Sequence, residues 1–344
     1  MNVAGALLDG LQRGVAPLDR LRRALYRWLA PWLGPWIRSR EVRIGLHGAL
    51  AVGGSLLLAA LAPLWMLALG PLLLGVPHLV ADLRYLVARP GLHRRRGAWL
   101  VAGLLVASSV TADLRWGLAG AALVPLGAHG VPARRALVAA GLGALAVASF
   151  VAPWPTSLGL AHAHNVVAVV AWMTLAVALH QDAAGNAVRW GTTLAFFAGG
   201  AAILGGLLDP VLLEGPTLPG APSVRDHLAT LAPGMDAPWG RRWVVAFAYA
   251  QSVHYGLWLR IVPEESRERP APRSWEASLR ALRRDLGAPV FAAAVLLCVA
   301  LAGWGLLDLA EARAGYLRLA LFHGPLELAV LGLVAAEGRA VLRP

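Results

Sequence analysis

Apolar blocks separated by short polar segments follow one another along most of the chain. Each block is about 20 residues long, the length with which an α-helix crosses the roughly 30 Å hydrocarbon layer of a bilayer. The pattern predicts an all-α fold, a polytopic integral membrane helical bundle with about ten transmembrane helices. The expected spans are residues 44–62, 64–87, 97–112, 114–130, 134–151, 157–180, 190–212, 242–262, 287–307 and 315–336. The third and fourth are short, and a re-entrant pair is the alternative for them.

Arginine is distributed unevenly among the segments between these spans. The N-terminal segment and residues 88–97, 134–135 and 260–286 hold most of it, whereas residues 152–156 carry no charge. Cytoplasmic loops of membrane proteins carry the excess of basic residues. Both termini are therefore expected in the cytoplasm.

The loops divide the chain into one membrane domain and its flanking segments. Residues 44–336 are expected to form a single transmembrane helical domain, followed by a cytoplasmic tail of residues 337–344. Residues 213–241, rich in proline and glycine, are expected as the longest external loop, either a connector or a lid. Residues 263–286 are expected as a basic cytoplasmic loop.

The N-terminal segment, residues 1–43, combines many arginines with Trp28, Trp32 and Trp36, which recur every four residues. A helix with a basic face and an aromatic face lies in the membrane–water interface, where anionic lipid attracts arginine. We expect a basic amphipathic helix on the cytoplasmic surface. A simple basic leader that orients the first span is the alternative.

Composition narrows the class of protein further. Charged residues make up 15% of the chain, well below the about 25% of soluble domains, and hydrophobic residues make up 58%. All 31 basic residues are arginine, and the net charge is +12. Such a charge is also typical of nucleic-acid-binding proteins, but this arginine lies in short loops between apolar blocks, so no nucleic acid partner is expected. Arginine without lysine in an Ala-, Gly- and Leu-rich chain indicates the bacterial inner (cytoplasmic) membrane, with membrane lipid as a partner.

Five of the ten histidines lie in the middle portions of predicted spans. Ionisable side chains in a bilayer are costly, face the interior of the bundle and mark functional sites. The four at similar predicted depth lie on four different spans: His78, His164, His254 and His323. We therefore predict a shared metal site formed by these four; the alternative is that each is a hydrogen-bonded structural residue. The weaker candidates are His162, which is nearer the outer surface, and His47, near a span end.

Acidic and amide side chains recur one helical turn from these histidines. Asp82 follows His78 by four residues and Glu327 follows His323 by four, so each pair shares a helix face. Metal-bound histidines usually donate their second N–H to such a group. Asp82, Glu327 and Gln251, which precedes His254 by three residues, are predicted in that role. Direct ligation by a carboxylate, or an ion pair of Asp82 with an arginine such as Arg84, remains open.

Helix breakers accompany two of these histidines. Pro77 precedes His78, and Gly324 and Pro325 follow His323. Irregular backbone in a membrane is tolerated where it is buried in protein or lines a cavity. A site of neutral imidazoles suits iron, copper, zinc or nickel, and heme with paired axial histidines is the alternative.

Two motifs resemble a known family. GVPHLVAD (residues 75–82) and FHGPLE (residues 322–327) resemble the GxPHGAxD signature of the Brp/Blh family of membrane β-carotene 15,15′-dioxygenases. The second motif lies near the C-terminus, whereas the family's motif lies early, and the family's His-Phe-Gly pattern is missing. The resemblance implies a helical membrane enzyme that holds Fe(II) through histidines and uses O₂ on an apolar, carotenoid-like substrate.

The expected function is therefore that of an integral membrane metalloprotein, a non-heme iron oxygenase acting on a lipid-soluble substrate. Three alternatives stay open. One is a heme-binding subunit that exchanges electrons with quinone, and the second is a proton-coupled transporter using His78, Asp82 and Glu327. The third is a structural or assembly protein. No individual catalytic residue is assigned from the sequence.

Overall fold

The computed structural model describes residues 3–180, 183–213, 216–268 and 271–343, and within these residues the chain forms helices and no strand. The α-helices are α1 (Val3–Arg38), α2 (Arg40–Leu61), α3 (Pro63–Asp82), α4 (Ala98–Thr111), α5 (Leu114–Leu123), α6 (Pro132–Val151), α7 (Pro153–Leu179), α8 (Ala183–Leu204), α9 (Val224–Leu231), α10 (Trp239–Gly256), α11 (Val262–Glu265), α12 (Trp275–Leu286), α13 (Ala288–Leu307), α14 (Leu309–Leu319) and α15 (His323–Glu337). The shorter turns are η1 (Leu83–Ala88), η2 (Leu92–Arg94), η3 (Val124–Gly127), η4 (Asp209–Val211), η5 (Leu257–Ile261), η6 (Ala320–Phe322) and η7 (Arg339–Leu342).

Helix boundaries follow local sequence signals. Ser39 separates α1 from α2, and its side chain accepts a hydrogen bond from the Val42 N–H. Helices α3, α6, α7 and α13 have proline in their first turn, where the missing N–H costs nothing. Asp308 accepts from the Glu311 N–H and so starts α14.

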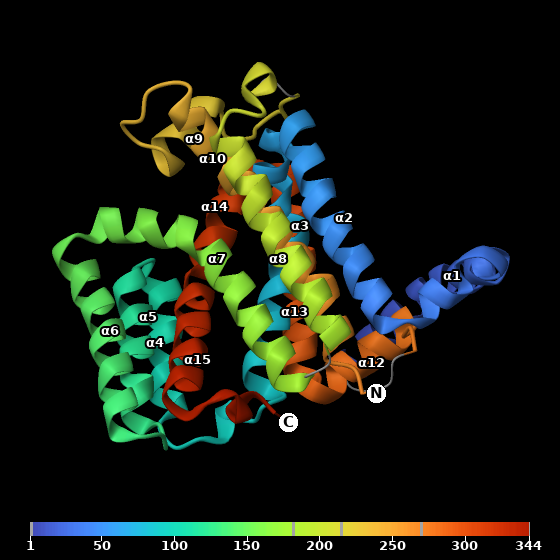
Figure 1. Ribbon diagram of the computed structural model, residues 1–344, viewed down its shortest axis with the longest axis horizontal. Coiled ribbons are helices and arrows are strands. Elements are labelled where there is room, and N and C mark those ends of the chain that lie inside the picture. The colour runs from blue at the N-terminus through green and yellow to red at the C-terminus, as the bar shows by residue number, and fades with distance from the viewer. Residues whose placement is uncertain (1–2, 181–182, 214–215, 269–270, 344) are drawn as a thin grey trace.

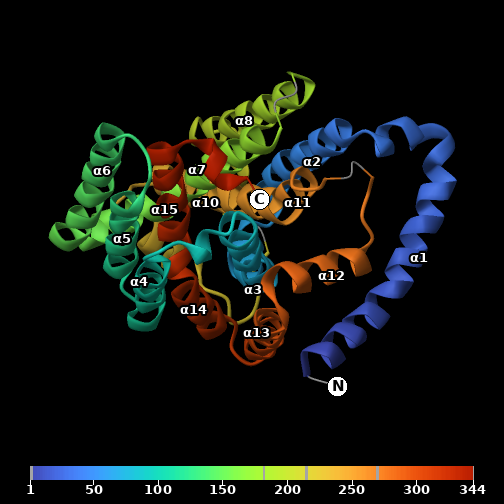
Figure 2. The same cartoon turned by 90° about the horizontal axis from the view of Figure 1, so that it is seen from below.

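The helices pack as a bundle with α10 at its centre. α10 contacts α2, α3, α7, α8 and α9, while α4, α5 and α6 lie together at one edge and pack against α15 (Figure 1). Seen from below, α1 runs along the side of the molecule and contacts α12, α13 and α2 (Figure 2). The contacts around α10 bring α3, α7 and α15 close to it, and these helices carry the predicted site.

Seven helices are long and apolar enough to cross a membrane, so the described chain has the character of a multi-pass membrane protein. They are Arg40–Leu61, Pro63–Ala88, Pro132–Val151, Pro153–Leu179, Gly185–Leu204, Ala288–Leu307 and Leu309–Glu337. The all-helical class is thus confirmed, but ten spans are not. Expected spans 97–112 and 114–130 correspond to α4, with 14 residues, and α5, with 10, which are too short.

Expected span 242–262 is helical but is less apolar than the other seven. It covers most of α10 and then η5, and residues such as Val244, Tyr249 and Val253 are fully buried there. Protein rather than lipid surrounds this helix on most sides. It therefore tolerates polar residues, among them Gln251 and His254, which lower its hydropathy.

The flanking segments also fold into helices. α1 exposes Trp28, Trp32 and Trp36 along one side, as an interfacial helix requires, although its place on a membrane remains a prediction. The N and C labels lie at one end of the bundle and α9 lies at the other (Figure 1). The loop of residues 213–241, whose residues 214 and 215 lie outside the described residues, contains α9, capped by Ser223 and Asp226.

Candidate metal site

The structure brings the four predicted histidines together from four elements of the bundle. His78 lies on α3, His164 on α7, His254 on α10 and His323 at the start of α15. Their four rings form a closed circuit of neighbours. The ring centroid of His254 lies 4.5 Å from that of His78 and 4.6 Å from that of His164. The ring centroid of His323 lies 4.3 Å from that of His164 and 5.1 Å from that of His78, which closes the circuit. Helix neighbours cannot be read from one sequence, so this convergence is new information.

Two π-helical segments directly follow the site on adjacent helices. η1 begins one residue after Asp82, and η5 begins three residues after His254. Short π-helical segments inside α-helices are rare and frequently lie at functional sites. Here each one changes the register of its helix just beyond a site residue.

A break between α14 and α15 places His323. The turn η6 ends at Phe322, and His323 is the first residue of α15, where its Nδ1 faces the Ala320 carbonyl. Gly324 follows, and a Cβ added there would lie 3.4 Å from His164 Nδ1. A glycine at this position thus lets α15 approach the imidazole on α7 closely.

Two nitrogens of the cluster face each other directly. His78 Nε2 lies 2.7 Å from His254 Nε2. Two ligands of one metal ion, each about 2.1 Å from it, are themselves about 3 Å apart, so this spacing fits adjacent ligands after a small adjustment. Among the described residues, two sets of three side chains could each hold a metal ion, because the ligand atoms within each set lie within 4.8 Å of one another. One set is His78, His254 and Glu327, and the other is His78, Asp82 and His323.

Two carboxylates complete the cluster. Asp82 Oδ2 lies 3.5 Å from His78 Nε2, and Glu327 Oε2 lies 3.3 Å from His164 Nδ1. Glu327 Oε1 is also 3.9 Å from His254 Nε2. Both carboxylates are fully buried, and within the described chain none of their four oxygens accepts a hydrogen bond. A buried carboxylate without a donor or a cation is strongly unfavourable, so these oxygens are suited to a positive ligand.

His254 and His323 have partners on their second nitrogens that differ from those predicted, whereas among the described residues His78 Nδ1 and both nitrogens of His164 have no hydrogen-bond partner. Asn165 Oδ1, not Gln251, lies 3.2 Å from His254 Nδ1. Glu327 faces His164 and His254 rather than His323, because His323 turns its Nδ1 toward the backbone of the preceding turn.

The suggested ion pair of Asp82 with Arg84 does not form. Arg84 instead binds Asp285 on α12 at 2.8 Å. Asp82 points into the bundle, whereas Arg84 lies in η1 and reaches out to the neighbouring helix. The carboxylate of Asp82 is thereby left to the histidine cluster.

The two weaker candidates lie outside the cluster. His162 Nε2 is 2.7 Å from the Leu231 carbonyl, and its ring packs against Trp243 in a separate hollow of about 310 Å³. His47 on α2 accepts a hydrogen bond at 2.9 Å from Arg260 Nε. Both candidates that the sequence ranked lower thus lie away from the four histidines.

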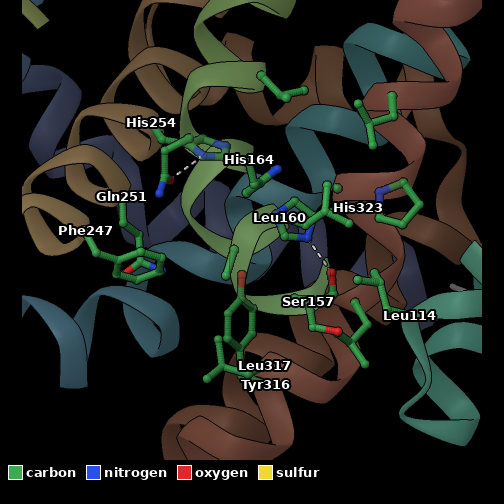
Figure 3. Close-up of a pocket in the computed structure, with 18 of the residues that line it drawn as sticks. Leu114, Ser157, Leu160, His164, Phe247, Gln251, His254, Tyr316, Leu317 and His323 are labelled. Carbon is green, nitrogen blue, oxygen red and sulfur yellow. Dashed lines mark hydrogen bonds between the residues drawn. The ribbon is translucent and has the colours of Figure 1, made fainter. Parts of the chain in front are cut away.

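A cavity of about 300 Å³ opens beside the cluster (Figure 3). His164, His254 and His323 line it, whereas His78, Asp82 and Glu327 do not. Most of its other walls are apolar, including Leu114, Leu160, Phe247 and Leu328. The wall includes Leu317, which is 36% exposed, so the cavity extends to the surface of the bundle. Three imidazoles therefore face the cavity and the carboxylates lie behind them.

Sequence reasoning missed a pair of tyrosines at this site. Tyr255 lies with its ring 5.3 Å from that of His78 and is hydrogen-bonded to Tyr316. Tyr316 points toward the histidines in Figure 3 and packs on Gly75, where an added Cβ would lie 2.2 Å from Tyr316 Cζ. Gly75, one turn before His78, was a signal that a neighbouring group approaches α3 closely.

Comparisons with known proteins identify no relative. No protein-family model matches this chain, no curated protein is significantly similar to it in sequence, and no solved structure matches its fold. The site must therefore be interpreted from its own geometry. That geometry defines a helical protein of membrane-spanning character with a buried histidine–carboxylate group able to hold a metal ion.

Proposed function

We propose that this chain is an integral membrane metalloenzyme, a non-heme iron oxygenase that acts on an apolar substrate in the cavity beside the histidine cluster. The observation that carries the proposal is the closed circuit of four histidines backed by two buried carboxylates that have no other donors.

Charge supports a cation at the cluster. When ionised, Asp82 and Glu327 would carry two negative charges into a region where imidazole nitrogens lie 3.3–3.9 Å away. A divalent ion would balance both charges and would bind the nitrogen lone pairs at the same time. Imidazole together with carboxylate is the donor set that non-heme Fe(II) enzymes use, which favours iron over magnesium or calcium.

The packing of the rings supports a free ion over heme. Two axial histidines of a heme lie on opposite sides of the iron, with their nitrogens about 4 Å apart and a porphyrin between them. His78 and His254 approach to 2.7 Å, and the rings of His164 and His323 stand edge to face at 4.3 Å. Neither of these two ring pairs leaves a slot for a macrocycle between its rings.

The cavity supports chemistry on an apolar molecule. A ferrous ion held here would supply the binding and activation of O₂. The side chains would orient the substrate against His164, His254 and His323, and the apolar walls would exclude water. The surface-exposed Leu317 marks a route by which a lipid-soluble molecule reaches the cavity from the bilayer.

The test is metal analysis and an optical spectrum of the full chain purified in detergent. The proposal predicts about one iron per chain, no Soret band, and loss of the iron in a variant with His78→Ala and His254→Ala. His162→Ala is the matched control, because it removes an intramembrane histidine outside the cluster and is expected to keep the iron.

The other outcomes favour different functions. A Soret band would replace this proposal with the heme-binding electron carrier. Absence of metal from the wild-type protein, under conditions in which a control iron protein keeps its metal, would favour the proton-coupled transporter or a structural role. Carotenoids are the first substrates to assay once iron is found, because the two motifs resemble a carotenoid dioxygenase family.

A further inference from the structure

The amide side chain of Gln251 on the cavity wall has no hydrogen-bond partner among the described residues. Gln251 lines the cavity, and its amide makes no hydrogen bond to any residue that the structure describes. Asn165, the other cavity-lining amide, is used by His254. Figure 3 shows Gln251 beside Phe247 at one side of the cavity, with the histidines next to it.

An amide in an apolar environment requires a hydrogen-bond partner. Transfer of an unpaired amide from water into such surroundings costs several times the net worth of one hydrogen bond. Inside a membrane protein, bulk water is not available to supply that partner. The Gln251 amide offers both a donor and an acceptor, so it is matched to a hydroxyl or carbonyl group of a bound molecule.

The charges around the cavity limit what this group is. The lining contains histidines, tyrosines, serine and amides but no arginine, aspartate or glutamate. A carboxylate or phosphate on the ligand would therefore lack a fixed positive side chain there. The polar end of the ligand is expected to be uncharged.

The position of Gln251 sets where that end lies. Gln251 precedes His254 by three residues on α10, a rise of about 4.5 Å along the helix. The polar end is thus held about one helical turn from the histidine cluster. The apolar remainder of the ligand then lies along the leucine-rich walls toward Leu317.

We propose that Gln251 binds the uncharged, oxygen-containing end of the substrate, and that the substrate is a hydrocarbon chain ending in an alcohol or carbonyl group rather than a pure hydrocarbon. This inference rests on the proposed function in one respect, that the cavity is the substrate site. It makes Gln251 a specificity-determining residue, a role distinct from the histidine support expected from its sequence position.

The test is binding of tritiated geraniol, a neutral ten-carbon alcohol, to the full chain in lipid nanodiscs, measured by scintillation proximity. The competitors are the matching hydrocarbon 2,6-dimethyl-2,6-octadiene, unlabelled geraniol and geranic acid. Because one neutral hydrogen bond changes affinity roughly two- to tenfold, geraniol should compete better than the hydrocarbon by about that factor. Geranic acid should compete more weakly than geraniol at pH 8, where it is charged.

Gln251→Met is the informative variant, since it keeps the volume and removes both hydrogen-bonding groups. It should bind the hydrocarbon as the wild type does, which verifies folding, and should lose the preference for geraniol. Gln12→Met on α1 is the matched control and should keep that preference. If Gln251→Met does not fold, Gln251→Asn replaces it and should lose most of the preference.

Three results would overturn the inference: no binding of geraniol, equal competition by the hydrocarbon in the wild type, or a geraniol preference that survives Gln251→Met. Repeating the assay on chelator-treated protein separates this inference from the proposed function. A preference that depends on Gln251 in a protein that never binds metal would leave this inference standing and end the oxygenase proposal. Bound iron in a protein that shows no Gln251-dependent preference for geraniol would end this inference and leave the oxygenase proposal standing.

Discussion

Two groups of buried carboxylates lie in this protein, and they are neutralised in different ways. At one end of the bundle, Glu264 binds Arg43 at 2.6 Å, and Glu265 binds Arg189 through two contacts of 2.8 and 3.0 Å. We call these four residues the arginine cluster. All of them are at least 90% buried, and each carboxylate has a guanidinium partner.

In the histidine cluster, made up of His78, His164, His254, His323, Asp82 and Glu327, no arginine pairs with either carboxylate among the described residues. The chain is not short of arginine, since it has 31 basic residues and all are arginine. Glu264 and Glu265 each have a guanidinium partner, and the buried carboxylate of Asp19 accepts hydrogen bonds from the N–H groups of Trp275 and Glu276. The contrast with Asp82 and Glu327, whose oxygens accept no hydrogen bond among the described residues, supports the proposal that the histidine cluster holds a cation.

The largest loss of stability is expected when a residue of the arginine cluster is replaced. Arg189→Met leaves Glu265 buried without its main partner, and breaking such a pair costs about 3–5 kcal/mol. Unfolding in mixed detergent should measure this loss, while metal content stays at the wild-type level. Arg27→Met, at an exposed position on α1, is the control. A loss below about 1 kcal/mol would show that the two clusters do not differ as described.

The same chemical change should act in opposite directions in the two clusters. Glu327→Gln removes a charge that lacks a donor, so the metal-stripped variant should be at least as stable as the metal-stripped wild type. Its metal affinity should fall by about 10- to 100-fold, the range for loss of a supporting group, or further if Glu327 is a direct ligand. Glu265→Gln should lower stability and leave affinity unchanged. Equal destabilisation by both changes would contradict the comparison.

Packing around the histidine cluster can be tested at Gly75. An alanine Cβ there would overlap the Tyr316 ring, which must then move away from α3. Overpacking of this kind costs about 1–3 kcal/mol and should also alter metal affinity. Gly53→Ala on α2 is matched to it, because nothing lies within 4 Å of that Cβ and alanine favours a helix. If Gly75→Ala and Gly53→Ala have the same stability and metal affinity, tight packing of Tyr316 on α3 does not position the histidine cluster.

The smallest effect concerns a buried histidine outside the membrane-spanning helices. Burial of His227 on α9, and then repulsion from Arg313, lower its pKa to about 4, against a smaller opposing effect of Asp226. The unfolded chain takes up this proton near pH 6.5, so the stability of this region is complete above pH 6.5 and falls as the pH drops toward 4. Hydrogen exchange of α9 amides at pH 7 and 5 should show faster opening at pH 5, and His227→Gln should reduce the difference. An identical pH response in the variant would contradict this assignment.

The sequence predicts the membrane-spanning helices better than it predicts which side chains meet at the histidine cluster. Hydropathy predicts helices such as Ala288–Leu307 well, because lipid-facing residues must be apolar on nearly every side. Hydropathy is a poor guide to whether α10 crosses the membrane, because a central helix is surrounded by protein and can carry polar residues that lower its hydropathy. The ten spans expected from apolar blocks are therefore not confirmed, and seven helices of the described chain meet the length and hydropathy that a span requires.

The four site histidines and the pairing of His78 with Asp82 were predicted from the sequence, but the partners of His254 and His323 were not. Spacing along one helix suggested Glu327 as the partner of His323, yet the turn η6 rotates that imidazole toward Ala320 and Glu327 faces His164. Which residues meet across helices depends on the rotation of each helix about its axis. The π-helical segments η1 and η5 lie directly after site residues on α3 and α10, and no local signal in the sequence announced them.

The most direct test of the central claim is metal-edge X-ray absorption spectroscopy of the purified full chain. The account predicts a metal with nitrogen and oxygen ligands at about 2.0–2.2 Å and with scattering from at least two imidazole rings. Glu327→Gln should change the oxygen contribution, whereas Glu265→Gln should leave the spectrum unchanged. A protein without bound metal, a sulfur or porphyrin ligand set, or a spectrum insensitive to His78→Ala would contradict it.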